Sequence, residues 1–258
     1  MRELHDDGPR VAPPAGLRGP ESLPAPRPGL GAGVAVLLGI AALAGLWAAF
    51  TGVGPAHLDG ELLGESMQSR TDTLTALAVV VTELGSTVSM ALLASAVGVW
   101  SWRAGRRADA VLAVGAMAGG AAVFRGLKEL LDRPRPPLDG RLVHAGNESL
   151  PSGHATMAIV VIGTLVVLAW AGRSPAARVV MVLGAALWVG AVGYTRIYLG
   201  VHWFSDVLAG WLVGGAWLAL CVAGWSWWRA RRPLVTGPGR TPPPAPDRRR
   251  GAAGRAGS

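Results

Sequence analysis

Long runs of apolar residues, broken by short polar segments, dominate the chain between residues 30 and 228. Six of these runs approach the roughly 20 residues that an α-helix needs to cross the hydrocarbon core of a bilayer. They cover about 30–50, 84–102, 110–131, 154–171, 177–194 and 203–228. The pattern therefore predicts an all-α fold, an integral membrane bundle of six transmembrane helices. A shorter apolar stretch at 73–82 is separated from the second run by Glu83, and it predicts an interfacial helix.

The composition agrees with a membrane protein and delimits its parts. Hydrophobic residues make up 51% of the 258 positions and charged residues 16%, whereas about a quarter of an ordinary soluble domain is charged. Residues 30–228 form the predicted membrane domain. Residues 1–29 and 229–258 are rich in Pro, Gly and Arg, and we expect disordered cytoplasmic tails there. The single cysteine, Cys221, falls inside the sixth run and predicts a buried thiol.

The net charge of +8 is distributed unevenly. An even number of spans puts both chain ends on one side of the membrane. If that side is the cytoplasm, 17 of the 24 Lys and Arg residues lie in cytoplasmic segments, which is the positive-inside pattern of plasma-membrane proteins. Topology thus accounts for the basic excess, and we expect no nucleic-acid partner. The outer face then receives the ends of the third and fifth spans and the starts of the fourth and sixth.

Three polar segments lie at these outer ends: 128–136 (KELLDRPRP), 151–154 (PSGH) and 195–206 (TRIYLGVHWFSD). Lys128, Arg135 and Arg196 would neutralise a phosphate group, and arginine adds a planar fork of donors. Ser152 and Gly153 precede an apolar run, so they are expected at a helix N-terminus, where backbone N–H groups and the helix dipole favour an anion.

The histidines supply candidate chemistry for this anion site. His202 and Asp206 are four residues apart, hence on one face of a helix. A carboxylate beside an imidazole fixes its tautomer and leaves the other ring nitrogen free to attack phosphorus. His154 is then the natural proton donor to the leaving oxygen. Nothing in the sequence requires a metal or another cofactor, since no clustered set of Asp, His and Cys ligands occurs.

Each segment also has a simpler interpretation. The basic residues of 128–136 would suit a collar that meets lipid headgroups. Ser152 would serve as a helix N-cap, and His202 with Asp206 as an interfacial pair without a catalytic role. Their joint placement at one membrane face favours a single anion site over three unrelated features.

Together the segments spell K-x6-R-P, P-S-G-H and [ST]-R-x5-H-x3-D. Over about residues 60–228 the chain thereby resembles the type 2 phosphatidic acid phosphatase family, which shares its core with the vanadium haloperoxidases. Thr195 stands where the family usually has serine, and it keeps the hydroxyl. The resemblance implies a membrane phosphatase that acts at one membrane face on a lipid phosphate or diphosphate through a phosphohistidine, and the charge distribution makes that face the outer one. It leaves the substrate open among undecaprenyl diphosphate, phosphatidylglycerol phosphate and phosphatidic acid.

The resemblance also implies roles for individual residues. His202 would be the nucleophile, Asp206 would orient it, and His154 would be the acid that later activates water. The residues implied in phosphate binding are Lys128, Arg135, Ser152, Gly153 and Arg196. Other charged or polar residues nearby would tune the substrate choice or be ordinary loop charges, namely Arg125, Arg133, Arg141, His144 and Glu148.

Two other classes stay open. A haloperoxidase would hold vanadate in the same pocket, but the haloperoxidases are soluble and six spans argue against one. A non-catalytic membrane protein, either a binding relative or a transporter-like bundle, would usually lack one of the two histidines or carry charges along a transport path. His154 and His202 are both present, and the spans lack such charges. The sequence does not determine the oligomeric state.

Overall fold

The computed structural model describes residues 28–146 and 148–231, and within them the fold is entirely helical. Most of each predicted tail, 1–29 and 229–258, lies outside the described residues. The helices are α1 (Pro28–Thr51), η1 (Gly54–Leu58), α2 (Asp59–Gln68), α3 (Asp72–Leu84), α4 (Thr87–Arg103), α5 (Arg107–Leu131), η2 (Leu138–Gly140), α6 (Gly153–Ala169), α7 (Pro175–Tyr198) and α8 (Phe204–Ala230).

Every predicted apolar run corresponds to a helix, and the all-α prediction is confirmed. By length and hydropathy, α1, α5, α7 and α8 can each cross a membrane alone. The pair α3 and α4, bent by 45°, makes a fifth candidate if it is counted as one span. The apolar helix α6 has 17 residues, fewer than the roughly 20 that a spanning helix needs. The helix lengths thus support four or five spans, and the sixth remains a prediction.

The bend between α3 and α4 has a local cause. Gly85 ends α3 where a side chain would collide with Val192 of α7, since a Cβ there would lie 2.6 Å from both methyl groups. Ser86 then starts a new helix, because its hydroxyl accepts a hydrogen bond from the N–H of Ser89 at 3.2 Å. The segment predicted as a separate helix before the second run is therefore α3.

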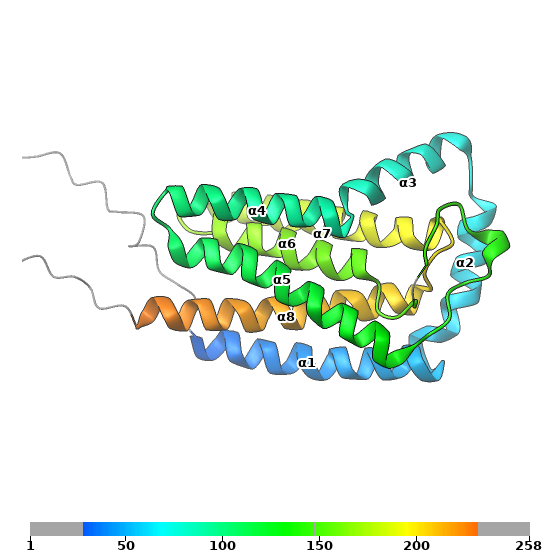
Figure 1. Cartoon of the computed structure of the whole chain (residues 1–258), viewed down its shortest axis with the longest axis horizontal. Helices are drawn as coiled ribbons and strands as arrows, with labels where there is room; N and C mark the ends of the chain where they lie inside the picture. The colour runs from blue at the N-terminus through cyan, green and yellow to red at the C-terminus, as the bar shows by residue number, and fades with distance from the viewer. Residues whose placement is uncertain (1–27, 147, 232–258) are drawn as a thin grey trace, which may run out of the picture.

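The long helices run side by side, and α1 lies along α8 (Figure 1). The start of α1, the α4–α5 turn, the α6–α7 turn and the end of α8 share one end of the bundle (Figure 1). The opposite end carries α2 and the two loops, residues 132–152 and 199–203, that hold most of the polar motif residues (Figure 1). The connectivity thus gathers the three motifs at one end.

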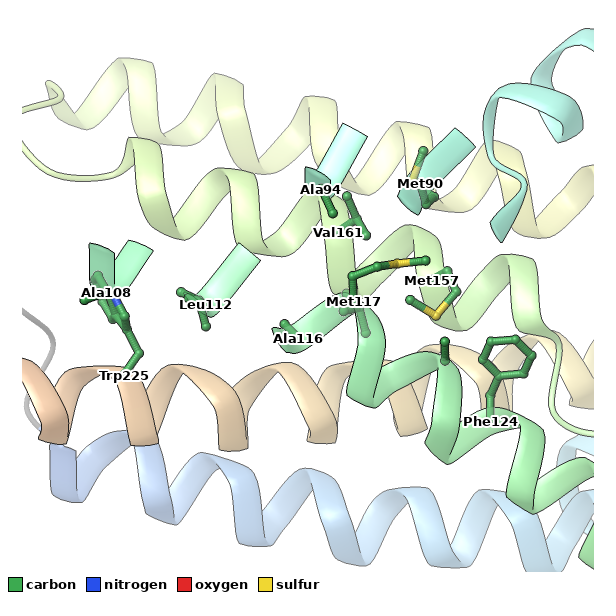
Figure 2. Packing of buried hydrophobic residues seen from close by; sticks show 12 residues of the cluster. Met90, Ala94, Ala108, Leu112, Ala116, Met117, Phe124, Met157, Val161 and Trp225 are labelled. Atoms are coloured by element: carbon green, nitrogen blue, oxygen red, sulfur yellow. The ribbon is translucent and has the colours of Figure 1, made fainter. Parts of the chain in front are cut away.

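A buried apolar cluster between α4, α5, α6 and α8 forms the centre of the bundle (Figure 2). Two glycines bring α8 very close to the start of α6. A Cβ at Gly210 would lie 2.8 Å from the carbonyl oxygen of Ser152, and one at Gly214 would lie 2.7 Å from that of Thr156. Small residues permit such close helix contacts. The first turn of α8, with Asp206, is thereby held against the N-terminus of α6.

Candidate active site

The ends of α5, α6 and α7 and the loop before α8 enclose a cavity of about 270 Å³. It is lined by Thr87, Phe124, Arg125, Lys128, Arg135, His144, Ala145, Gly153, His154, Arg196 and His202. Six of the eight site residues expected from the sequence are in this lining, and the other two, Ser152 and Asp206, lie directly behind it. The lining contains four Lys or Arg side chains and no Asp or Glu. Such a cavity is electrostatically suited to an anion.

His202 is placed in the cavity by a tight turn between α7 and α8. The N–H groups of Val201 and His202 both donate to the carbonyl oxygen of Arg196, at 3.1 and 3.2 Å. Gly200 makes this turn possible with φ of +73°, a left-handed conformation that favours glycine. The imidazole is almost fully buried, with 2% of its surface exposed.

The hydrogen bonds of His202 define its tautomer. Its Nε2 lies 3.1 Å from Nη1 of Arg135, and its Nδ1 lies 3.4 Å from Oδ2 of Asp206. A guanidinium only donates, so Nε2 is the acceptor and Nδ1 carries the proton toward the carboxylate. Burial lowers the pKa of His202 to about 3; the Asp206 hydrogen bond opposes this shift, and Arg135 adds to it. At neutral pH the ring is therefore neutral, with the Nε2 lone pair directed toward Arg135.

Asp206 is fully buried, and its carboxylate accepts several hydrogen bonds. Oδ2 accepts from the N–H of Trp203 at 2.9 Å and from the hydroxyl of Ser149, in addition to facing His202. Oδ1 accepts from Nη1 of Arg133. Asp206 thus closes the N-terminus of α8 and orients the imidazole at the same time. Hydrogen bonds of this kind favour an ionised carboxylate.

Three contributors to this network were not predicted as site residues. Arg133 donates to Asp206 and, from Nη2, to Oδ2 of Asp59 at 2.8 Å. Asp59, at the start of α2, also accepts from the N–H and the hydroxyl of Ser205, at 2.8 and 2.6 Å. Ser149 is the third. Arg133 stands two residues before Arg135 in the first motif, which is a usable signal, but no sequence pattern connects Asp59 with residues about 75 and 146 positions away.

Lys128 and Arg135 support the loops as well as lining the cavity. Lys128 Nζ donates to the carbonyl oxygens of Glu148 and Ser149, the latter at 3.3 Å. Arg135 donates to the carbonyl oxygen of Val201 beside its contact with His202. Burial lowers the pKa of Arg135 to about 10 despite the opposing charge of Asp206, so its guanidinium stays cationic at neutral pH. Arg135 thus remains a charged group of the cavity.

Arg196, in the last turn of α7, is in the lining of the cavity. Its Nη1 donates to the hydroxyl of Thr82, while its Nε is buried and has no hydrogen-bond partner among the described residues. The hydroxyl of Thr195 donates to the carbonyl oxygen of Val192 at 2.7 Å, so it serves its own helix rather than the cavity.

The N-terminus of α6 forms another wall. Ser152 occupies the N-cap position, but its hydroxyl makes no capping hydrogen bond and has no partner within the described part of the chain. Its N–H donates to the carbonyl oxygen of Asp206 at 3.0 Å. The simple capping role for the serine hydroxyl is therefore wrong. Gly153 is required by the ring of Phe124, because a Cβ there would lie 2.9 Å from Cε2. The half-buried His154 follows in the first turn.

Comparisons with known proteins agree with the motifs. Phosphatidylglycerophosphatase B of Bacillus subtilis is 37% identical over 91 residues, which are 34% of this chain and 44% of that protein. An undecaprenyl-diphosphatase of Sulfolobus acidocaldarius is 44% identical over 71 residues, 28% of this chain and 30% of that protein. The matched parts are thus less than half the length of these curated relatives.

The fold has a counterpart among solved structures. A crystal structure of a transmembrane PAP2-type phosphatidylglycerolphosphate phosphatase from Bacillus subtilis matches with a TM-score of 0.64 and 25% identity. The match covers 73% of this chain and 94% of that one. A family model, described as the PAP2 superfamily, matches residues 109–230, which contain all three motifs. The resemblance seen in the motifs is confirmed, because residues 109–230 match the PAP2 superfamily.

Proposed function

We propose that this protein is a membrane phosphatase that hydrolyses a lipid phosphate or diphosphate through a phosphohistidine intermediate at the outer face of the membrane. The observation that carries the proposal is the position of His202. Its neutral Nε2 faces Arg135 in a cavity lined by four Lys or Arg side chains and no acid. A nucleophilic nitrogen beside cations is suited to attack a phosphate that those cations bind.

The proposed reaction has two steps, of which the first transfers the phosphate to His202. Arg135, Arg196, Lys128 and the N-terminus of α6 bind the phosphate oxygens. Nε2 of His202 then forms a bond to phosphorus while the bond from phosphorus to the leaving oxygen breaks. Asp206 stabilises the cationic ring that results, because its carboxylate faces Nδ1.

His154 is the proposed proton donor to the leaving oxygen. It lines the same cavity as His202, in the first turn of α6. A bound phosphate dianion favours the protonated form of His154. After the leaving group departs, neutral His154 takes a proton from water, which attacks the phosphohistidine and releases inorganic phosphate. The cations and the helix N-terminus supply the positive charge that the reaction needs, so no metal takes part in this proposal.

The substrate class and the sidedness rest on further observations. The site lies at one end of helices that are long and apolar enough to span a membrane, so a substrate with its headgroup at that end keeps its tail in the bilayer. The relatives named above are phosphatases of lipid phosphates and diphosphates. Arginines concentrate at the opposite end, for example Arg103, Arg107, Arg173 and Arg178, which favours a cytoplasmic location for that end.

A substrate panel tests the proposal. Purified full-length protein is incubated with phosphatidic acid, phosphatidylglycerol phosphate and undecaprenyl diphosphate, and released inorganic phosphate is measured. We expect turnover of at least one lipid, with loss of turnover in His154→Asn. If the wild-type protein releases phosphate from none of them, the proposed function is wrong.

A further inference from the structure

Beyond the groups assigned to the transferred phosphate, Arg125 and His144 also line the cavity. Arg125 lies on α5, three residues before Lys128, so the two side chains share a helix face. His144 comes from the loop between α5 and α6. Both side chains are exposed, whereas Lys128, Arg196 and His202 are buried. Arg125 and His144 are therefore at the mouth of the cavity, outside the buried group of phosphate-binding residues.

The guanidinium of Arg125 lies beside an aromatic ring and is not neutralised by an acid among the described residues. Its guanidinium carbon lies 5.8 Å from the centre of the Phe124 ring, a cation–π distance. The Phe124 ring also packs against Gly153 at the start of α6. Within the described residues no Asp or Glu forms an ion pair with Arg125. The cavity thus carries a fourth cation whose charge is available to a ligand.

The number of cations exceeds what one phosphate needs. A phosphate monoester carries about −1.5 to −2 charges at neutral pH, and Lys128, Arg135 and Arg196 already supply three positive charges. A fourth cation at the mouth fits a ligand with more negative charge just outside the reacting phosphate. In a lipid diphosphate the second phosphate occupies that place, joined to the first through one bridging oxygen.

We propose that Arg125 and His144 form a second anion subsite that binds the lipid-attached phosphate of a diphosphate substrate. The inference rests on the proposed phosphatase function. Nε2 of His202 bonds to the terminal phosphorus, the bond from that phosphorus to the bridging oxygen breaks, and His154 protonates the bridging oxygen. The leaving group is a lipid monophosphate, and its charge, which rises in the transition state, lies against Arg125. The subsite makes the protein a better diphosphatase than monophosphatase.

A matched pair of substrates tests the subsite. Farnesyl diphosphate and farnesyl monophosphate differ by one phosphate, so the ratio of their kcat/KM values isolates its contribution. We expect Arg125→Gln to lower this ratio about tenfold, equivalent to about 1.4 kcal/mol, and His144→Asn to lower it less. Arg107→Gln is the matched control, because it removes an arginine that also stacks on a ring, Trp102, at the other end of α5. The control should keep the wild-type ratio.

A binding measurement separates the subsite from the proposed function. Pyrophosphate and phosphate are titrated into full-length wild-type protein and into Arg125→Gln by calorimetry. The subsite predicts that the wild type prefers pyrophosphate and that the variant loses this preference. If the wild type hydrolyses neither the farnesyl compounds nor any lipid of the substrate panel but shows this loss of preference, the phosphatase function is wrong and the subsite stands. If Arg125→Gln leaves both the kcat/KM ratio and the pyrophosphate preference unchanged, the subsite is wrong, whatever the activity.

Discussion

The guanidinium of Arg133 holds the carboxylate of Asp206, donating from Nη1 to Oδ1. Neither group is freely solvated: the Asp206 side chain is 0% exposed and that of Arg133 is 14% exposed. The second nitrogen of the same guanidinium donates to Asp59 on α2. Asp206 is therefore positioned for His202 from two sides, by its own helix turn and by a cation that is anchored to another helix.

This relationship predicts that Arg133 is a positioning residue. In Arg133→Gln the buried Oδ1 of Asp206 loses its cationic donor, and Asp206 is free to turn away from His202. A lost charge-assisted hydrogen bond of about 1.5–3 kcal/mol corresponds to a roughly tenfold to hundredfold decrease. We expect this decrease in kcat with little change in KM, measured by phosphate release. Asp59→Asn should give a smaller decrease of the same kind.

Arg141→Gln is the control for this prediction. Arg141 is in the same loop, but within the described residues its guanidinium donates to the backbone carbonyl oxygens of Pro136 and Ala145. A general loss of loop structure would affect both variants alike and would raise KM. Equal losses of kcat in Arg133→Gln and Arg141→Gln would contradict the positioning role.

The contrast between these residues shows what sequence patterns can and cannot predict. Apolar runs and short motifs depend on neighbouring positions, so they predicted the helices and the convergence of Lys128, Arg196 and His202. The contacts of Asp59 depend on how α2 packs against the start of α8, and no local pattern encodes that. The apolar runs also do not determine the number of membrane spans. The helix α6 has only 17 residues, and the chain bends at Gly85 between α3 and α4.

The proposed nucleophile gives the second prediction. His202→Ala removes the nitrogen that bonds to phosphorus, so phosphate release should fall to background. Wild-type protein that is incubated with a lipid labelled on its terminal phosphate and then quenched in alkaline detergent should carry an acid-labile, alkali-stable label that His202→Ala lacks. His57→Ala is the control, because His57 is an exposed histidine outside the cavity lining and should retain full labelling. Near-wild-type turnover in His202→Ala would refute the phosphohistidine mechanism.

The third prediction concerns stability at low pH. The folded-state pKa of His202 is about 3, below the ordinary value of about 6.5. As the pH falls below about 6.5, the unfolded chain binds a proton at His202 that the folded chain excludes. The free energy of unfolding then decreases by up to about 1.4 kcal/mol for each pH unit, until the pH approaches 3.

His202→Gln lacks this titration, so it isolates the effect. We expect the Tm of the variant minus that of the wild type to be constant between pH 8 and 7 and to rise between pH 6.5 and 5. Intrinsic tryptophan fluorescence in one detergent provides the measurement. A Tm difference that is constant down to pH 5 would show that His202 binds its proton equally in the folded and the unfolded protein, and would contradict the prediction.

The fourth prediction concerns metals and transition-state analogues. Side-chain cations and the N-terminus of α6 provide the charge at the site, so turnover should survive prolonged treatment with EDTA. Vanadate should inhibit competitively, because its five-coordinate form resembles phosphorus under attack by His202. Arg196→Gln should weaken this inhibition, since Arg196 is one of the cations that line the cavity. Loss of turnover on chelation, restored by Mg²⁺, would overturn the metal-free mechanism.

The fifth prediction concerns the side of the membrane that the site faces. Of the 24 Lys and Arg residues, 17 fall in the segments assigned to the cytoplasm, and four of the other seven line the cavity, namely Arg125, Lys128, Arg135 and Arg196. Single cysteines in a Cys221→Ala background report sidedness through a membrane-impermeant maleimide. Asp139→Cys, in the exposed loop after α5, should react in intact cells. Ala104→Cys, in the α4–α5 turn, should react only after the cells are permeabilised. The reverse labelling would place the site in the cytoplasm, where the enzyme would act on lipids of the inner leaflet.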